Sequence, residues 1–330
     1  MKKMFGALAS LSLSLAACGP QIETVSFKDG LPSQDMGKLE VPSKTSQSID
    51  DGVATVRQQA RGDLAGTWLI TGGTVLFVNG VTLWTLGSLN FVAGFEPASD
   101  NGTTAVWGPH TNDWEATTWK LTAVRTAPNA FKYTLEAKPK GSADSAYAAI
   151  ITGSHTVAVD EDGKAIKGYG EGRFDIDYDK AARLPHQDSK RGRVSFHYAR
   201  PNPTAAVTVD VDLKEFVNDA AVPNTAAYRY SQVPGGEGAF EFATDSNIHW
   251  FDPAKVALER WTIKSRWLST GEGRADVRAT GGDLPSPITM NECWDTNFRS
   301  TFLDGSEPSQ VKWGVESSDC VFRGASYSTR

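Results

Sequence analysis

Cysteine and histidine are scarce in this chain of 330 residues, which contains three cysteines and five histidines. No histidine pair has the i, i+4 spacing with a glutamate that zinc enzymes use, and no serine lies in a Gly-x-Ser-x-Gly turn. A phosphate-binding glycine loop is also missing. We therefore predict no metal, no cofactor and no catalytic residue, and favour a protein that is not an enzyme. The dispersed histidines are His110, His155, His186, His197 and His249.

Blocks of basic residues are absent as well. The formal net charge is −6, and acidic and basic residues are interspersed along the chain. Proteins that bind nucleic acid concentrate Lys and Arg in a patch or stripe, so we predict no nucleic-acid partner.

The first 17 residues have the order of a bacterial export signal. Lys2 and Lys3 precede an apolar run that is too short to span a bilayer, so residues 1–17 are expected to be a cleaved signal peptide. The run ends in Leu-Ala-Ala-Cys-Gly, which resembles the lipobox of bacterial lipoproteins. That resemblance implies acylation of Cys18 and a membrane partner held through this lipid. We expect a cell-envelope protein anchored in the outer membrane; an ordinary signal peptide with a chance cysteine is the alternative.

The two other cysteines form an even pair in a protein that we expect to be exported. Cys293 and Cys320 lack nearby histidines that would complete a tetrahedral metal site. A disulfide is the usual fate of such a pair in an oxidising compartment, so we predict that it forms.

The polarity of the chain changes near residue 60. Residues 18–60 are rich in Ser, Gln, Asp, Lys and Pro and poor in aromatic residues, and such a composition buries too little surface to offset its ordering entropy. We predict a lipidated, flexible tether over 18–60, followed by a single β-rich domain over 61–330.

Residues 67–95 contain no charged side chain, and glycine recurs every seven residues from Gly66 to Gly94. On a helix this spacing forms one stripe, whereas on a strand it would alternate between faces. We predict a buried helix near 73–94 whose glycines allow close packing on a sheet or another helix. A buried β-hairpin and a membrane-inserted helix are the alternatives.

Apolar and polar residues alternate from Thr103 onward. Eleven short segments between 118 and 279 read as strands, and turn residues such as Asp162-Gly163 separate them. Closely spaced strands without intervening helices predict a mainly β (α+β) fold. We expect an antiparallel meander forming a barrel or half-barrel, with the glycine-striped helix packed in or across it and the disulfide pinning a loop-like C-terminal segment.

Charged residues occupy the polar side of three predicted strands. The ordinary interpretation is an apolar inner face and a polar outer face with cross-strand ion pairs. A polar groove is the alternative and makes these residues a candidate binding surface. The residues are Asp175, Asp177, Asp179, Asp210, Asp212, Arg260, Lys264 and Arg266.

Several short motifs resemble a group of predicted lipoproteins from myxobacteria and related bacteria. They include the Trp-Gly-Pro-His-Thr turn around His110, in which we interpret the histidine as structural. The resemblance covers most of residues 60–325 and implies a lipoprotein with one continuous domain. It implies no catalytic residue. The motifs lie at 107–111, 265–267, 270–276, 281–284, 292–294 and 320–322.

A curved sheet around an apolar helix can enclose an apolar cavity. We therefore predict that this envelope protein binds an apolar ligand or lipid. A glycan- or protein-binding surface module is the second hypothesis, and an enzyme of unidentified class is the third.

Overall fold

The computed structural model describes residues 25–42, 59–111, 114–185, 190–217, 224–247, 254–308 and 310–330. The expected signal peptide and Cys18 lie outside these ranges, as do His186 and His249. The helices are η1 (Gln34–Gly37), α1 (Gly66–Ala93), η4 (Asp144–Ala146), α2 (Tyr178–Ala181) and α3 (Glu316–Asp319). The first seven strands are β1 (Ser99–Asp100), β2 (Thr104–His110), β3 (Thr117–Ala127), β4 (Ala130–Pro139), β5 (Ala148–Val159), β6 (Ala165–Asp177) and β7 (Arg191–Arg200). The other seven are β8 (Val207–Val217), β9 (Asn224–Gln232), β10 (Gly238–Ser246), β11 (Glu259–Trp267), β12 (Gly273–Thr280), β13 (Ile288–Trp294) and β14 (Ser300–Gly305).

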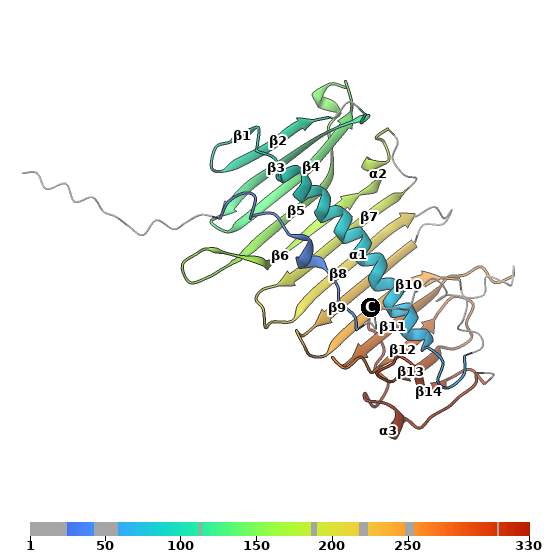
Figure 1. The fold of residues 1–330 in the computed structure, drawn as a ribbon. Helices are drawn as coiled ribbons and strands as arrows, with labels where there is room; N and C mark the ends of the chain where they lie inside the picture. Colours follow the sequence, from blue (N-terminus) through green and yellow to red (C-terminus); the bar gives the residue numbers. More distant parts are fainter. Residues whose placement is uncertain are drawn as a thin grey trace, which may run out of the picture.

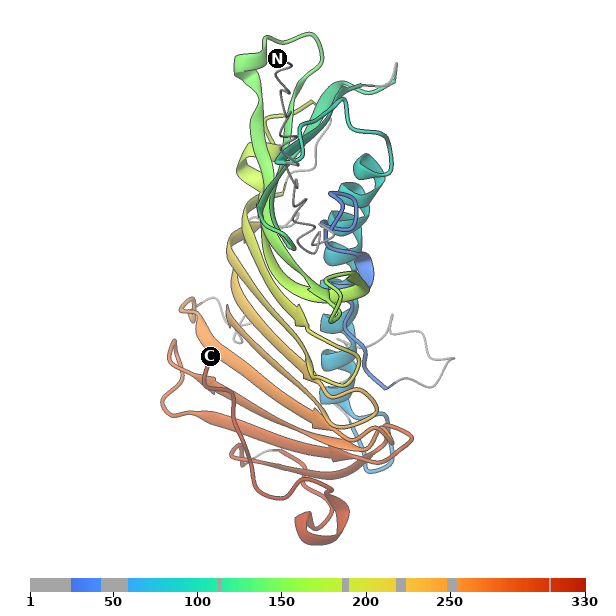
Figure 2. The same ribbon diagram turned by 90° about the vertical axis from the view of Figure 1, so that its left-hand side faces the viewer.

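All described strands belong to one sheet of 14 strands in sequential order, each antiparallel to the next. The mainly β meander is thus confirmed. The sheet curves but stays open, with β1 and β14 at its two edges (Figures 1 and 2). The closed barrel among our expectations is wrong, because no pairing joins these two edge strands within the described chain.

Side chains of alternating polarity separate the two faces of the sheet. On β8, Val209, Val211 and Leu213 are buried, while Asp210 and Asp212 point to the other side. Helix α1 lies on the concave face of the sheet (Figure 2). The buried side chains of the strands belong to the same core cluster as those of α1, so they line the concave face, and the charged side chains lie on the convex face. Period-two alternation therefore predicted the faces correctly over most of the sheet.

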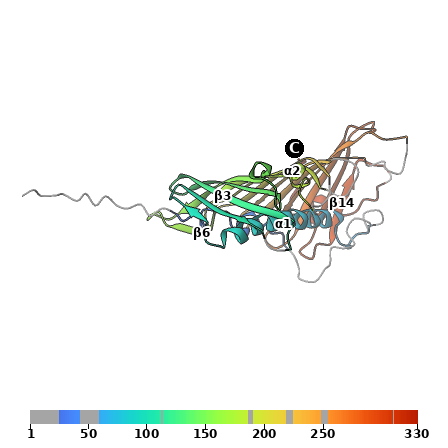
Figure 3. The same cartoon turned by 90° about the horizontal axis from the view of Figure 1, so that it is seen from above.

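Helix α1 crosses the strands on the concave face from the β13 end to the β2 end (Figures 1 and 3). At its start, the Thr67 amide and hydroxyl donate to the buried carboxylate of Glu292 at 2.9 and 2.7 Å. The Trp68 ring stacks on Phe298 at 4.4 Å between ring centroids. One long helix is confirmed, beginning about two turns before the predicted position, and the hairpin alternative is wrong.

Threonine hydroxyl groups on the buried side of α1 form hydrogen bonds with the backbone of the same helix. The Thr71 and Thr82 hydroxyls donate to the carbonyls of Thr67 and Val78, four residues earlier, at 2.8 and 2.9 Å. Polar side chains can thus be buried under the helix without an unsatisfied donor.

The glycine stripe does not face the sheet, contrary to our expectation. At 100° per residue, Gly73, Gly80 and Gly87 lie opposite the buried Val78 and Leu89. A Cβ atom added at Gly80 would meet no atom within 4 Å. The helix packs on the sheet with its larger side chains, so Gly80 is exposed on its outward face, and Gly73 and Gly87 are half-buried on the same side.

Residues 25–42 also differ from the prediction of a flexible tether. Val25, Phe27, Leu31, Met36 and Leu39 are buried in the core, because isolated apolar residues of this polar segment fill the space beside α1 and β4. We call residues 25–42 the strap.

Polar residues of α1 hold the strap in place. The Asn79 side chain accepts from the Leu39 amide and donates to the Leu39 carbonyl, at 2.7 and 2.9 Å. Asn90 donates to the Pro32 carbonyl at 2.8 Å. These asparagines interrupt the apolar run of α1 because they bind another segment of backbone.

The C-terminal residues include two more strands than we expected. Residues 283–330 were predicted to be loop-like, yet they contain β13 and β14, whose sequences do not alternate regularly. The predicted disulfide is confirmed, with a Cα–Cα distance of 5.5 Å between Cys293 and Cys320. After the disulfide the chain crosses the convex face, where Arg330 pairs with Asp210 on β8.

Candidate functional site

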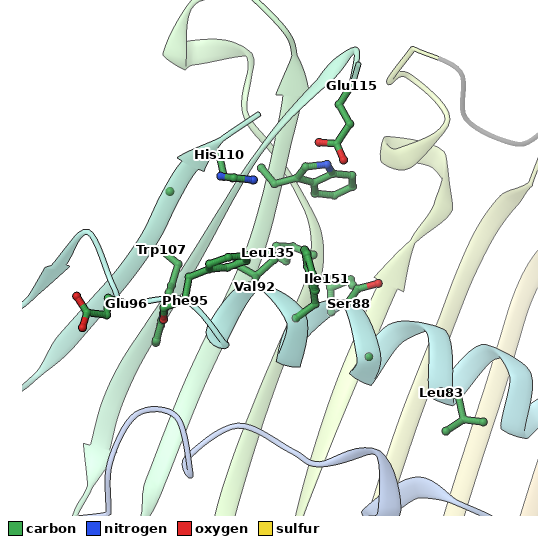
Figure 4. A pocket seen from close by; sticks show the side chains of 14 residues that line it. Leu83, Ser88, Val92, Phe95, Glu96, Trp107, His110, Glu115, Leu135 and Ile151 are labelled. Carbon is green, nitrogen blue, oxygen red and sulfur yellow. The ribbon is translucent and has the colours of Figure 1, made fainter. Parts of the chain in front are cut away.

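A cavity of about 680 Å³ lies between the C-terminal half of α1 and the strands near the β1 edge (Figure 4). This volume falls within the ~300–1,000 Å³ typical of small-molecule pockets. Its inner wall is formed by Leu135 on β4, Ile151 on β5 and Val92 on α1. The remaining lining residues are Leu83, Gly87, Ser88, Phe91, Phe95, Glu96, Trp107, Gly108, His110, Glu115 and Trp119.

The end of α1 is fixed to β2 at one side of this pocket. The Trp107 indole nitrogen donates to the Phe95 carbonyl at 3.0 Å. The Phe95 ring stacks on His110 at 5.8 Å and meets Phe91 edge-to-face at 5.4 Å between ring centroids. These contacts hold an aromatic wall over the cavity.

A backbone irregularity in β2 shapes the same wall. The pairing of β2 with β3 shifts between Trp107 and His110. Gly108 has a φ of +93°, and a Cβ there would lie 2.7 Å from the Trp119 carbonyl oxygen, so only glycine fits. The bulge brings His110 to the pocket. From the sequence, we had interpreted this histidine only as a structural residue of a turn.

The pocket combines an apolar interior with a polar margin. Leu135 and Ile151 are buried, whereas His110, Glu96 and Glu115 are exposed at the rim. Such an arrangement excludes water from an apolar ligand and leaves charged groups in solvent, where they need no buried partner. The site therefore suits a ligand with an apolar body and a polar end.

The charged residues predicted as a binding surface lie on the convex face or at its edge, away from this pocket. On the central strands they form cross-strand pairs. Asp210 pairs with Arg229 at 2.9 Å, and Lys264 pairs with Glu241 at 3.4 Å. The other cross-strand pairs there are Arg260–Asp245 at 3.2 Å and Arg266–Asp276 at 3.1 Å, and Asp212 pairs with Arg330 of the C-terminal segment at 3.8 Å.

Three of the predicted residues lie near the end of β6. Asp175 accepts from the Ser195 hydroxyl at 2.6 Å, Asp177 pairs with Lys180 at 3.2 Å, and Asp179 accepts from the Gly192 amide at 3.0 Å. Asp175 and Asp177 also line a polar depression of about 360 Å³. Five of the eight residues therefore form ion pairs on the central strands, Asp175 and Asp177 line this smaller depression, and Asp179 binds a backbone amide beside it.

Strand β5 carries a buried histidine, His155, that does not line the pocket. The His155 Nδ1 atom and the Tyr198 hydroxyl are 3.0 Å apart, and the His155 Nε2 atom makes no hydrogen bond to the described residues. Burial lowers the pKa of His155 to about 4, and the nearby backbone of Glu171 has a smaller, opposite effect. Its imidazole is consequently neutral at pH 7, and burial also raises the pKa of Tyr198.

A scan against protein-family models, a search of curated proteins and a search of solved structures each find no match to this chain. Within the described residues, no group of three or more His, Cys, Asp or Glu side chains could hold a metal ion. The fold and the pocket alone therefore define the class: an open antiparallel sheet whose concave face is crossed by a helix and carries an apolar cavity.

Proposed function

We propose that this chain is a lipid-anchored protein of the bacterial cell envelope that binds an apolar ligand between α1 and the β2–β5 part of the sheet. The observation that carries the proposal is the 680 Å³ cavity with its apolar interior. Each methylene group moved from water into such a site gains about 0.8 kcal/mol, so an acyl chain of several carbons would bind without any charged contact. The sequence at Cys18 supports the anchor, and export to the outer membrane is part of the proposal.

A fluorescent long-chain fatty acid tests ligand binding. We expect residues 19–330, which retain every described residue, to bind this probe and to co-purify with lipid detectable by mass spectrometry. Val92 lies in the pocket wall and is only partly buried, so Val92→Trp fills the cavity without displacing the core. We expect this variant to bind at least tenfold more weakly.

The matched control is Val256→Trp, which makes the same exchange at a side chain that is 76% exposed and lies outside the pocket. Equal probe binding by the two variants, or no binding by the unmodified chain, would refute the proposal.

A further inference from the structure

The outward face of α1 and the residues just after it carry five exposed apolar side chains. Leu76, Phe91 and Phe95 are 55%, 68% and 54% exposed, and Phe77 and Leu83 are also exposed. Between them lies Gly80, and no residue from 67 to 95 carries a charge. Monomeric soluble proteins rarely leave an apolar patch of this length in water. We call the five exposed apolar side chains and the glycines between them the outward stripe.

We infer that the outward stripe lies on the surface of a lipid bilayer, in the membrane that carries the N-terminal anchor. The inference rests on the proposed function, since it takes the acylated Cys18 as the anchor. An uncharged stripe suits hydrocarbon, whereas the convex face of the sheet carries ion pairs such as Asp210–Arg229.

The position of the strap supports this orientation. Val25, its first residue, comes seven residues after Cys18, so the acylated residue lies within about 25 Å of it, since an extended chain covers ~3.5 Å per residue. The strap runs along α1 on the same side of the sheet (Figures 1 and 2). A lipid attached there draws the α1 side of the molecule toward the membrane rather than the convex side.

The helix is long and apolar enough to cross a membrane. However, Val78, Leu86 and Leu89 bury its inner face against the sheet. A helix covered by protein on one side cannot be surrounded by lipid, so it lies along the bilayer surface instead of spanning it.

The pocket opens beside this stripe. Leu83, Phe91 and Phe95 belong to the stripe and also line the cavity. An acyl chain could therefore pass between the bilayer and the pocket without crossing water, which makes a membrane lipid the class of ligand that the site takes.

Flotation with phosphatidylcholine vesicles tests the inference, using residues 19–330 so that no acyl anchor contributes. Phosphatidylcholine is zwitterionic, so it does not repel the net negative charge of the protein as an anionic lipid would. We expect the protein to float with the vesicles and to do so equally at high salt, because the contact is apolar. Leu76→Glu should reduce the bound fraction about fivefold or more, whereas Val256→Glu, the same charge on an exposed side chain outside α1, should leave it unchanged. Leu76 does not line the pocket, so its variant should still bind the fatty-acid probe.

The outcomes separate this inference from the proposed function. Probe binding that Val92→Trp removes, without flotation, overturns the bilayer contact and leaves ligand binding intact. Flotation that Leu76→Glu abolishes, without probe binding, retains the bilayer contact and refutes the pocket function. A dimer in analytical ultracentrifugation that Leu76→Glu converts to a monomer shows that a second copy covers the stripe, and this overturns the inference.

Discussion

Replacing Gly80 with alanine tests which side of α1 packs on the sheet. If the glycine stripe faced the sheet, an added methyl group would crowd a filled interface and destabilise the protein. In the structure Gly80 is exposed and a Cβ there meets no atom within 4 Å, so no packing energy is lost. Alanine has the higher helix propensity by about 0.8–1 kcal/mol, partly because glycine gives the unfolded chain more freedom. We therefore expect Gly80→Ala to raise the free energy of unfolding by that amount.

Gly37 in the strap provides the matched control. A Cβ at Gly37 would lie 2.6 Å from the Cγ2 atom of Thr82, whose side chain is buried and held by its hydrogen bond to Val78. Overpacking of this kind costs about 1–3 kcal/mol, so Gly37→Ala should lower the free energy of unfolding. Glycine-to-alanine substitution is thus expected to change the free energy of unfolding in opposite directions at Gly80 and Gly37.

Urea unfolding of residues 19–330, followed by tryptophan fluorescence, measures both changes. A loss of more than about 1 kcal/mol for Gly80→Ala would refute the orientation of α1, because helix propensity alone cannot produce it. An unchanged Gly37→Ala variant would show that the strap does not pack against the helix.

Further predictions concern the disulfide, a buried histidine, the helix start and the anchor. Removing the disulfide with Cys320→Ser should lower the free energy of unfolding by about 3.5 kcal/mol, by the chain-entropy relation for a separation of 27 residues. Non-reducing peptide mapping of the native protein should recover the two cysteine-containing peptides joined. The pKa of His155 is about 4 in the fold against 6.5 in the unfolded chain, so the unfolded state takes up the proton first as pH falls. Stability should therefore drop by about 2 kcal/mol from pH 6.5 to pH 4.5. His155→Gln should remove that part of the pH dependence, and identical slopes for the two proteins would contradict it. Glu292→Ala leaves the Thr67 amide and hydroxyl without their buried acceptor and should cost about 2–3 kcal/mol in urea unfolding, with Glu307→Ala on the exposed loop as the neutral comparison. Cys18→Ala should abolish incorporation of an alkyne-labelled fatty acid, and retention of the label would place acylation elsewhere.

Local sequence patterns were sufficient for most of the sheet. Alternation such as Val209, Val211 and Leu213 against Asp210 and Asp212 identified both the strands and their faces, because successive side chains of a strand point in opposite directions. β1, β2, β13 and β14 were missed. β1 has only two residues, and segments such as Met290-Asn291-Glu292 of β13 do not alternate in polarity.

The pocket could not be located from the sequence. Its wall joins Val92 on the helix to Leu135 and Ile151 on strands that follow much later, and an isolated apolar residue gives no sign of the empty space beside it. The Gly108-Pro109-His110 turn was the one local signal near the site, and its bulge became meaningful only with β3 alongside.

By itself, the sequence determined an antiparallel meander with one long apolar helix and a Cys293–Cys320 pair, because strand alternation, helix length and cysteine count are local or compositional properties. The tertiary structure decided the rest. Helix α1 is uncharged, and polar residues such as Thr71 and Asn79 are spread around it, so its sequence carries no preferred face. Contact with the sheet selected the side bearing Val78 and Leu89 and left Gly80 outward. Whether the meander closes depends on the accumulated twist and on pairing between its first and last strands, which no single strand encodes, and here the sheet stays open.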